Sequence, residues 1–344
     1  MLSVSVVIPV RNAARTLPHC LEALEGLDPQ PMEVILVDNG STDETPELLR
    51  TFAQDHASRG VKIVQEPRAG VSRARNAGIR VARGDILAWT DSDCAPQPSW
   101  LRYLVEPFDE PTVGATAGRV LAASPSSIVE LFCGLYTFQT PNSPNRAHQW
   151  TPRRGGYAGA NFAVRRVLAE KLGGYDEEVK NWGEDYDFCA RLYAHGFSIA
   201  YVPAAQVFHY NRATVRGMLH QAYGQGRSHP YLLRRHAARG LWIDLPCFPV
   251  SWRSCPLPLW VDLASADKKV GGILALGTVS APALWLLPLY LAWLVLLNYR
   301  KPRIGAVRIS PLTAMGLAGL LLLKSGAMTA GRWRGSLKYG ALCF

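Results

Sequence analysis

Short apolar segments alternate with amphipathic ones along the first hundred residues. The apolar segments are rich in β-branched residues, and they are Val4–Val10, Val34–Val37, Val61–Val64 and Ile86–Trp89. They recur about every 25 to 30 residues, which is typical of βαβ units. Between the first two, residues 13–27 place their apolar side chains on one helical face. The pattern predicts an α/β fold with a mainly parallel sheet covered by helices.

Other local patterns extend this prediction. Ser41 and Glu44 have the spacing of a capping box and predict a helix start at Ser41. The remaining expected elements are a strand at Val113–Leu121, a helix at Ile128–Phe138, a polar loop at Pro141–Gly159, a helix at Glu184–His195, and strands at Ser198–Val202 and Gln206–Tyr210.

Two long apolar stretches follow. Gly271–Leu297 holds no charged residue and would be about 40 Å long as one helix, enough to cross a bilayer. Ile309–Gly331 is similar, interrupted only by Lys324. Buried core helices are the alternative for both. We therefore expect three regions: 1–215, an interfacial, amphipathic connector at 216–267, and a membrane-anchoring helical region at 268–344 with candidate spans 271–297 and 309–331.

The topology of these stretches stays open. The segment Asn298–Arg308 between them carries four basic residues. If residues 1–245 are cytoplasmic and both stretches span, this segment lies outside, which the positive-inside rule disfavours. A re-entrant hairpin broken at Pro282 and Pro288 would keep every basic cluster on the cytoplasmic side.

Charge is distributed unevenly along the 344 residues. The net charge of +10 divides into +1 for residues 1–245 and +9 for residues 246–344. A basic and apolar tail fits a membrane surface, so we expect no nucleic-acid partner.

The seven cysteines form no CxxC pair, which argues against a disulfide scaffold or a zinc site and favours a reducing compartment. The N-terminus has no basic segment before its apolar run, so it predicts a strand instead of a signal peptide.

Acidic residues follow the expected strands. Asp91 and Asp93 come directly after the fourth strand, Asp38 ends the second, and Pro9 lies at the end of the first. Ligands of doubly wound sheets bind at the carboxyl ends of strands, so these residues should line one crevice. Two carboxylates there suit Mg²⁺ or Mn²⁺ with phosphate oxygens, although a DxD sequence alone is also found in ordinary polar turns.

Two nearby loops narrow the ligand class. The first βα turn, Pro9–Ala13, contains no glycine, so a dinucleotide cofactor is not expected. Gly70–Gly78 offers Arg73, Arg75 and Asn76 near a helix N-terminus, a good setting for a diphosphate.

The series VVIPVRN, EVILVDNGSTDET, GVSRARNAGI and TDSDC resembles the donor half of family 2 glycosyltransferases with a GT-A fold. The resemblance covers residues 3 to about 215, in the expected order and spacing of motifs. It implies a nucleotide-sugar donor, a divalent metal and inversion at the anomeric carbon. Region 1–215 would then be the catalytic domain.

The resemblance also implies roles for donor-side residues. Residues around the nucleotide base and ribose would be Pro9, Arg11 and Asp38. Those near the diphosphate or donor sugar would be Arg75 and Asn76. Asp91 would contact the ribose or metal-bound water, while Asp93 would bind the metal and His209 would be a further metal ligand.

The segment Gly183–Leu192 resembles the family's ED motif at a helix start. By resemblance Asp185 is the base that deprotonates the acceptor hydroxyl, and Glu184 helps to orient the acceptor. From the residues alone, acidic residues that favour a helix N-terminus explain the segment equally well. Trp182 would stack on a sugar, and Asn161 would contact donor or acceptor sugar.

The combined expectation is a membrane-associated inverting glycosyltransferase at the inner (cytoplasmic) membrane, with its catalytic domain facing the cytoplasm. A UDP-sugar is the favoured donor, and a lipid-linked or polysaccharide acceptor in glycan or exopolysaccharide assembly is the favoured acceptor. One alternative is a sugar-phosphate nucleotidyltransferase, which would need a glycine-rich basic loop after the first strand. The other is an inactive membrane scaffold, which would be expected to lose the DxD or ED carboxylates.

Overall fold

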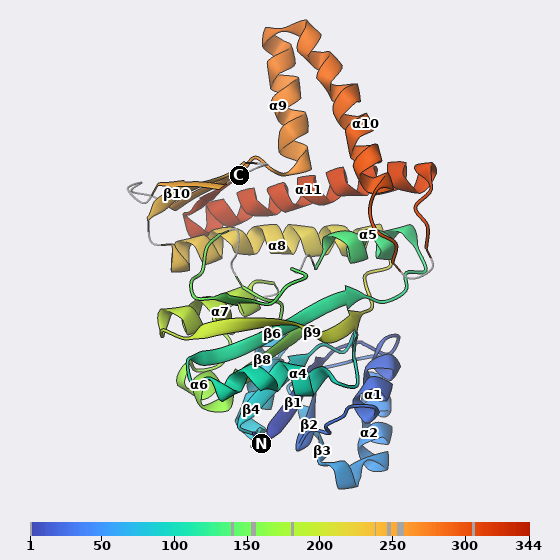
Figure 1. Cartoon of the computed structure of the whole chain (residues 1–344), viewed down its shortest axis with the longest axis vertical. Helices are drawn as coiled ribbons and strands as arrows, with labels where there is room; N and C mark the ends of the chain where they lie inside the picture. The colour runs from blue at the N-terminus through green and yellow to red at the C-terminus, as the bar shows by residue number, and fades with distance from the viewer. Residues whose placement is uncertain are drawn as a thin grey trace. The chain divides into compact units, whose positions relative to one another are not determined.

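The computed structural model describes residues 2–138, 141–152, 156–179, 182–237, 239–245, 249–252, 258–304 and 307–344. The chain folds into two compact units (Figure 1). Unit 1 comprises Met1–Leu121, Phe138–Trp150 and Gly155–Tyr210. Unit 2 comprises Ala122–Thr137, Thr151–Arg154 and Asn211–Phe344. Each unit is therefore assembled from segments that are distant in the sequence.

Unit 1 is built on one mixed sheet, in which the described residues form nine strands in the order β3-β2-β1-β4-β8-β6-β9-β5, with β7 paired to β9. The parallel half consists of β1 (Val4–Val10), β2 (Glu33–Asp38), β3 (Val61–Gln65) and β4 (Ile86–Thr90). The other half consists of β5 (Cys94–Pro96), β6 (Val113–Ala122), β7 (Asn145–Ala147), β8 (Asn161–Arg165) and β9 (Ser198–His209). Its pairs β4–β8, β6–β8, β5–β9 and β7–β9 are antiparallel. The parallel arrangement expected from the sequence thus applies to the first four strands.

Both faces of the sheet are covered, which explains why β2 is buried at every position. Side chains alternate between the two faces along each strand. One face packs on α1 (Leu17–Glu25), α2 (Thr45–Asp55) and α4 (Trp100–Val105). The other packs on α3 (Val71–Val81), α6 (Arg166–Lys171) and α7 (Glu184–Ala194).

The strand register sets the position of the site. Val10 pairs with Asp38 in the parallel β1–β2 ladder, and Val7 pairs with Trp89 in the β1–β4 ladder. The carboxyl ends of β1, β2 and β4 therefore meet at one edge of the sheet, where Asp91 follows directly after β4.

Some local predictions are wrong. Helix α2 begins at Thr45 instead of Ser41, because Ser41 is part of the loop: its Oγ accepts from the Asn12 N–H, and its N–H donates to Asp38 Oδ1. The expected loop at 141–159 includes the short strand β7, and its residues 153–155 lie outside the described part. The two strands expected at 198–210 are one, β9.

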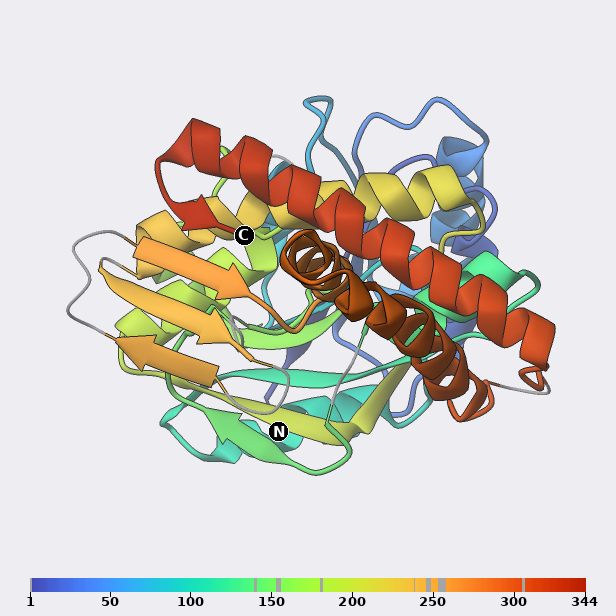
Figure 2. The same cartoon turned by 90° about the horizontal axis from the view of Figure 1, so that it is seen from above.

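Unit 2 contains two long helices that lie side by side, α8 (Val215–His236) and α11 (Pro311–Tyr339) (Figures 1 and 2). Helix α5 (Ile128–Tyr136) packs against α11 through Phe132, Leu317 and Leu320. A small sheet orders β11 (Pro249–Trp252), β10 (Gly240–Asp244), β12 (Pro258–Asp262) and β13 (Leu342–Cys343).

The stretch 271–297 is not one continuous helix. Helix α9 (Ala266–Val279) ends before Ser280, a short 3₁₀ turn follows at Ala281–Trp285, and α10 (Leu286–Tyr299) runs back. The two helices form a hairpin that projects from α11 on the side away from α8 (Figure 1). Pro282 lies in the turn, as the re-entrant alternative requires. The break expected at Pro288 is wrong, because this residue lies in the first turn of α10, where a proline is tolerated.

Candidate active site

The residues expected around the nucleotide base and ribose lie at the ends of β1 and β2. Asp38 is 4% exposed, and its Oδ1 accepts a hydrogen bond of 3.0 Å from the Ser41 N–H, which fixes the carboxylate at the strand end. Pro9 is half-buried and Arg11 is exposed. The structure therefore brings these three residues to the same edge of the sheet.

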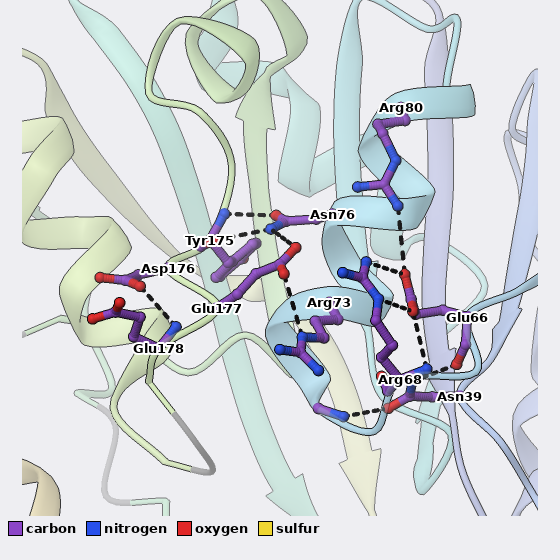
Figure 3. Close-up of polar contacts among 11 residues, drawn as sticks. Asn39, Glu66, Arg68, Arg73, Asn76, Arg80, Tyr175, Asp176, Glu177 and Glu178 are labelled. Atoms are coloured by element: carbon purple, nitrogen blue, oxygen red, sulfur yellow. Dashed lines mark hydrogen bonds and ion pairs between the residues drawn. The ribbon is translucent and has the colours of Figure 1, made fainter.

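Asn39, which the sequence analysis did not single out, holds the next loop in place (Figure 3). Its Nδ2 donates to the carbonyl oxygens of Glu66 and Arg68, and its Oδ1 accepts from the Gly70 N–H at 2.8 Å. One buried amide thus ties the loop after β3 to the end of β2 and sets the position at which α3 begins.

Arg75 on α3 joins two carboxylates from different parts of the chain. Its Nη2 lies 3.1 Å from Asp91 Oδ1 after β4, and its Nη1 lies 2.9 Å from Glu184 Oε1 at the start of α7. The Arg75 side chain is 3% exposed and lies over the Tyr175 ring, with 5.1 Å from the guanidinium carbon to the ring centroid. A Cβ on Gly159 would lie only 2.5 Å from Nη2, so this position accommodates the guanidinium because it is glycine.

Three buried polar atoms at this junction are without a hydrogen-bond partner in the part of the chain that the structure describes. They are Arg75 Nε, Glu184 Oε2 and the hydroxyl oxygen of Tyr175. Burying an unpaired polar atom is costly. The arrangement is therefore one that a bound polar molecule, or water, would complete.

Asp185 lies next to this pair and is only partly buried. Its Oδ2 accepts from the Gly159 N–H at 3.1 Å, and its Oδ1 accepts from the Tyr186 N–H at 2.9 Å. Desolvation, followed by the negative charge of Glu184, raises the pKa of Asp185 to about 7. A carboxylate with that pKa is suited to accept a proton near neutral pH.

A possible metal site lies where β5 meets β9. Asp93 Oδ1 is 3.5 Å from His209 Nε2, and one ligand atom each of Asp93, Cys94 and His209 lies within 4.8 Å of the others. Cys94 is fully buried in the core. A carboxylate and an imidazole are suitable donors for Mn²⁺, whereas Mg²⁺ prefers oxygen ligands alone. The donor set therefore fits a divalent cation.

The geometry does not support a direct ligand contact for two residues that the sequence analysis placed in the site. The Asn76 amide donates to the Tyr175 carbonyl and accepts from the Tyr175 N–H (Figure 3). Asn161 is 1% exposed, accepts from Trp100 Nε1, and donates to the carbonyls of Arg119 and Ala205. These contacts occupy both amides and hold segments of the fold together.

Trp182 is half-buried and adopts a left-handed backbone conformation with φ of 64° directly before α7. Few non-glycine residues adopt this conformation, and it often marks a functional constraint. Tyr175, beneath Arg75, is a further candidate site residue. The sequence analysis missed it, because no motif or spacing distinguishes it from a core tyrosine.

Comparisons with known proteins bear on the family of the chain and on its fold. Residues 5–173 match the model of the family "Glycosyl transferase family 2", and residues 146–214 match "N-terminal domain of galactosyltransferase". A pre-mycofactocin glycosyltransferase of Mycobacterium tuberculosis is 31% identical over 241 residues, which are 68% of this chain and 48% of the relative. Glycosyltransferase AglE of Haloferax volcanii is 29% identical over 258 residues, 72% of this chain and 81% of the relative. The chain spans about half the length of several curated relatives that it matches.

The fold has a counterpart among solved structures. A mannosyltransferase from Pyrobaculum calidifontis, determined in complex with GDP-Man and Mn²⁺, superposes with a TM-score of 0.57 at 20% identity. The match covers 94% of this chain and 86% of that chain. The likeness establishes a common fold.

Proposed function

Because the chain belongs to glycosyltransferase family 2 and has the GT-A fold, we propose that it transfers a sugar from a nucleoside diphosphate donor to a hydroxyl group. The observation that carries the proposal is the position of Arg75. Its guanidinium binds Asp91 on the donor side and Glu184 on the acceptor side, next to Asp185. The ends of a sheet and the start of a distant helix thus form one acid–base centre.

In this mechanism Asp185 acts as the general base. Its ionised carboxylate takes the proton of the acceptor hydroxyl while the acceptor oxygen forms a bond to the anomeric carbon. The bond from that carbon to the diphosphate oxygen breaks, and the nucleoside diphosphate leaves. Attack from the face opposite the leaving group inverts the anomeric centre.

Other residues position the reactants. Asp38 would accept from the imide N–H of the nucleobase, with Pro9 and Arg11 beside the base and ribose. Glu184, fixed by Arg75, would orient the acceptor, and Trp182 would stack on its sugar ring. Asp93 and His209, with Asp91 nearby, would hold Mn²⁺ or Mg²⁺. A bound cation there supplies positive charge that stabilises the diphosphate leaving group.

The donor nucleotide follows from the base-binding carboxylate. Uracil presents an imide N–H to Asp38, and thymine presents the same group, so a UDP-sugar is our first choice. The GDP-Man bound in the Pyrobaculum structure makes a GDP-sugar the principal competitor. A thermal-shift comparison of UDP-, GDP- and dTDP-sugars with Mn²⁺ separates these donors, since a bound donor stabilises the folded state by mass action.

We also place the enzyme at a membrane. Two helices are long and apolar enough to cross a bilayer by length and composition, Ala281–Tyr299 and Pro311–Tyr339. Much of the hairpin surface is apolar and exposed, including Leu276, Val279, Trp285 and Leu289. A lipid-linked acceptor of glycan assembly, at the cytoplasmic side of the inner membrane, fits such an anchor.

The alternatives have less support. The first βα turn has no glycine-rich basic loop, which a nucleotidyltransferase would need. All four DxD and ED carboxylates are present, and one of each motif, Asp91 and Glu184, binds Arg75, which an inactive scaffold has no reason to retain.

The central test is a set of substitutions assayed for donor hydrolysis and transfer. We expect Asp185→Asn to lower kcat by at least about 100-fold, because a positioned general base contributes roughly that much. Its thermal shift with donor and Mn²⁺ should remain, since Asp185 does not bind the donor.

Asp93→Ala should instead lose the thermal shift caused by Mn²⁺. Glu178→Gln, on the exposed loop before α7, is the control. Full transfer by Asp185→Asn would refute the assigned base.

A further inference from the structure

Helix α11 is long enough to cross a bilayer, but its packing rules this out. It lies against α8 from Met218 near Leu317 to Pro230 near Gly335. The contact is close: a Cβ on Gly226 would lie 2.0 Å from the Met328 carbonyl oxygen. If α11 crossed the bilayer, α8 would therefore have to cross it as well.

Helix α8 is too polar to cross a bilayer. It carries Arg216, His220, Arg227, His229, Arg234, Arg235 and His236 along its length. Charged side chains in the hydrocarbon core are costly, and each would have to be buried there if α8 and α11 spanned together. The pair must therefore lie outside the hydrocarbon core.

The face of α11 that α8 leaves uncovered is mainly apolar. Its exposed apolar and small residues recur every three or four positions and are Leu312, Met315, Gly319, Leu323, Gly326, Ala330, Trp333 and Leu337. Two exposed basic residues, Arg334 and Lys338, lie beside this stripe in the last turns of the helix. Leu337 is 84% exposed and Trp333 is 56% exposed. A helix with one apolar stripe and a tryptophan on it is suited to lie in the plane of a membrane interface.

The α9–α10 hairpin projects from α11 on the side away from α8 (Figure 1). No charged residue occurs from Val270 to Tyr299. Val279, at the end of α9, is 88% exposed, and Trp285 in the turn is 75% exposed. An exposed apolar surface of this kind marks a contact site for a protein or a membrane, and the basic residues that flank the hairpin favour a membrane.

Both feet of the hairpin are held within unit 2. At the foot of α9, Asp267 accepts hydrogen bonds from Ser325 and Thr329 of α11. At the foot of α10, the fully buried Asn298 accepts from the Tyr136 hydroxyl of α5 at 2.7 Å. The chain therefore enters and leaves the hairpin on one side.

The hairpin is also short. Helix α9 has 14 residues, about 21 Å in length, and only its last ten are free of charge. The hydrocarbon core is about 30 Å thick. Basic residues flank the hairpin in the sequence, namely Lys268, Lys269, Arg300, Lys301, Arg303 and Arg308. They complement the anionic headgroups of the leaflet that the hairpin enters.

From these observations we infer that unit 2 is a monotopic anchor. The α9–α10 hairpin dips into one leaflet, α11 lies in the interface, and neither apolar stretch crosses the bilayer. The inference rests on the membrane association proposed above and is independent of the reaction catalysed.

Site-directed labelling tests the topology. Single cysteines are introduced by Leu263→Cys, Ala283→Cys, Pro302→Cys and Lys338→Cys in a Cys247→Ser, Cys255→Ser background of the full chain. The cysteines of the described residues are buried. Membrane vesicles of both orientations are treated with an impermeant maleimide. We expect positions 263, 302 and 338 to label from the same side, and position 283 from neither side until detergent dissolves the bilayer.

The outcomes separate the possible errors. Labelling of position 302 only from the side opposite position 263 would establish a spanning segment and overturn the inference, while leaving membrane association intact. Labelling of position 283 from the far side, or its protection even in detergent, would also overturn it. A background protein found entirely in the soluble fraction would refute membrane association itself.

A second pair of variants tests insertion without relying on labelling. Leu289→Asp places a charge on the exposed hairpin, and Val167→Asp places one on the exposed surface of unit 1, where the side chain is 60% exposed. We expect Leu289→Asp to raise the soluble fraction by about tenfold or more, because a charge in the hydrocarbon core is strongly disfavoured. Val167→Asp should leave it unchanged. Equal partitioning of the two variants would contradict insertion of the hairpin.

Discussion

Two neighbouring arginines on α3 have very different surroundings. Arg75 is 3% exposed and binds the two carboxylates of Asp91 and Glu184, whereas Arg73 is 31% exposed and lies 3.3 Å from Glu177. Removing one partner of a buried ion pair leaves the other charge uncompensated. A partly exposed pair contributes little because water solvates and screens it.

Substitution of these arginines tests that difference. We expect Arg75→Met to lower the free energy of unfolding by about 3–5 kcal/mol, and Arg73→Met to lower it by less than about 1 kcal/mol. Denaturant unfolding of the purified proteins in detergent measures both. Equal stability of the two variants would mean that the buried Glu184 carboxylate does not need Arg75 as its partner.

The pH dependence of kcat/KM reports the ionisation of Asp185. The base must be ionised, so activity should rise with pH and level off above about 7, the value to which desolvation and Glu184 raise its pKa. Glu184→Gln removes one of these causes, and we expect it to move the acid limb to lower pH. Glu178→Gln should leave the limb in place. An unchanged limb in Glu184→Gln would indicate that another group titrates.

Sequence motifs predicted most of these candidate site residues, but not their contacts. Arg75 and Glu184 are 109 positions apart, and only the folded sheet brings them within 2.9 Å. Asn161 follows the glycine-containing segment 155–159, yet its register in β8 places it between Trp100, Arg119 and Ala205 in the core. Pairing between distant strands determines which polar residues face the site, and local patterns do not contain that information.

At the level of elements, the parallel strands were predictable, because β-branched runs that alternate with helical patterns at this spacing are typical of βαβ units. The start of α2 was not, since the Ser41 side chain binds Asn12 across the loop instead of capping the helix. The break after Val279 was suggested by Pro282, but the course of the chain beyond it depends on contacts with Tyr136, Ser325 and Thr329.

Glycines in α11 distinguish its packed side from its exposed side. A Cβ on Gly331 would lie 2.1 Å from the Tyr223 carbonyl oxygen, whereas one on Gly319 has no atom within 4 Å among the residues described. We expect Gly331→Ala to lower the free energy of unfolding by about 1–3 kcal/mol through overpacking. Gly319→Ala should raise it by about 0.5–1 kcal/mol through helix propensity.

Thermal unfolding in one detergent compares the two alanine variants directly. A stabilising effect of Gly331→Ala would show that α8 and α11 are not in close contact, which would remove the first step of the monotopic assignment.

At the scale of the whole molecule, charge and apolar surface coincide. Residues 246–344 carry a net charge of +9 and also contain the exposed hairpin. Each basic residue near an anionic membrane surface contributes about 1 kcal/mol. The distribution of charge therefore predicts which lipids the protein prefers.

Vesicle flotation at low salt tests this preference. With vesicles containing phosphatidylglycerol, we expect the double variant Arg300→Gln, Arg303→Gln to bind about 30-fold more weakly than the parent, from a loss of about 2 kcal/mol. The double variant Arg50→Gln, Arg59→Gln changes exposed residues of unit 1 by the same charge and should bind like the parent. The difference should disappear at high salt. Equal binding by both would exclude the basic feet as lipid contacts.

Helix α5 has a consequence for biosynthesis. It packs on Leu317 and Leu320 of α11, and its Tyr136 carbonyl oxygen accepts from the Lys324 ammonium, 188 positions away. These partners leave the ribosome long after α5 does. At roughly 5–20 residues per second, the wait is about 10–40 s. During that time Phe132 and its neighbours have no native partner from α11. The nascent chain therefore displays an apolar helix well before its hairpin is made, and completion of unit 2 depends on the last segment to be translated.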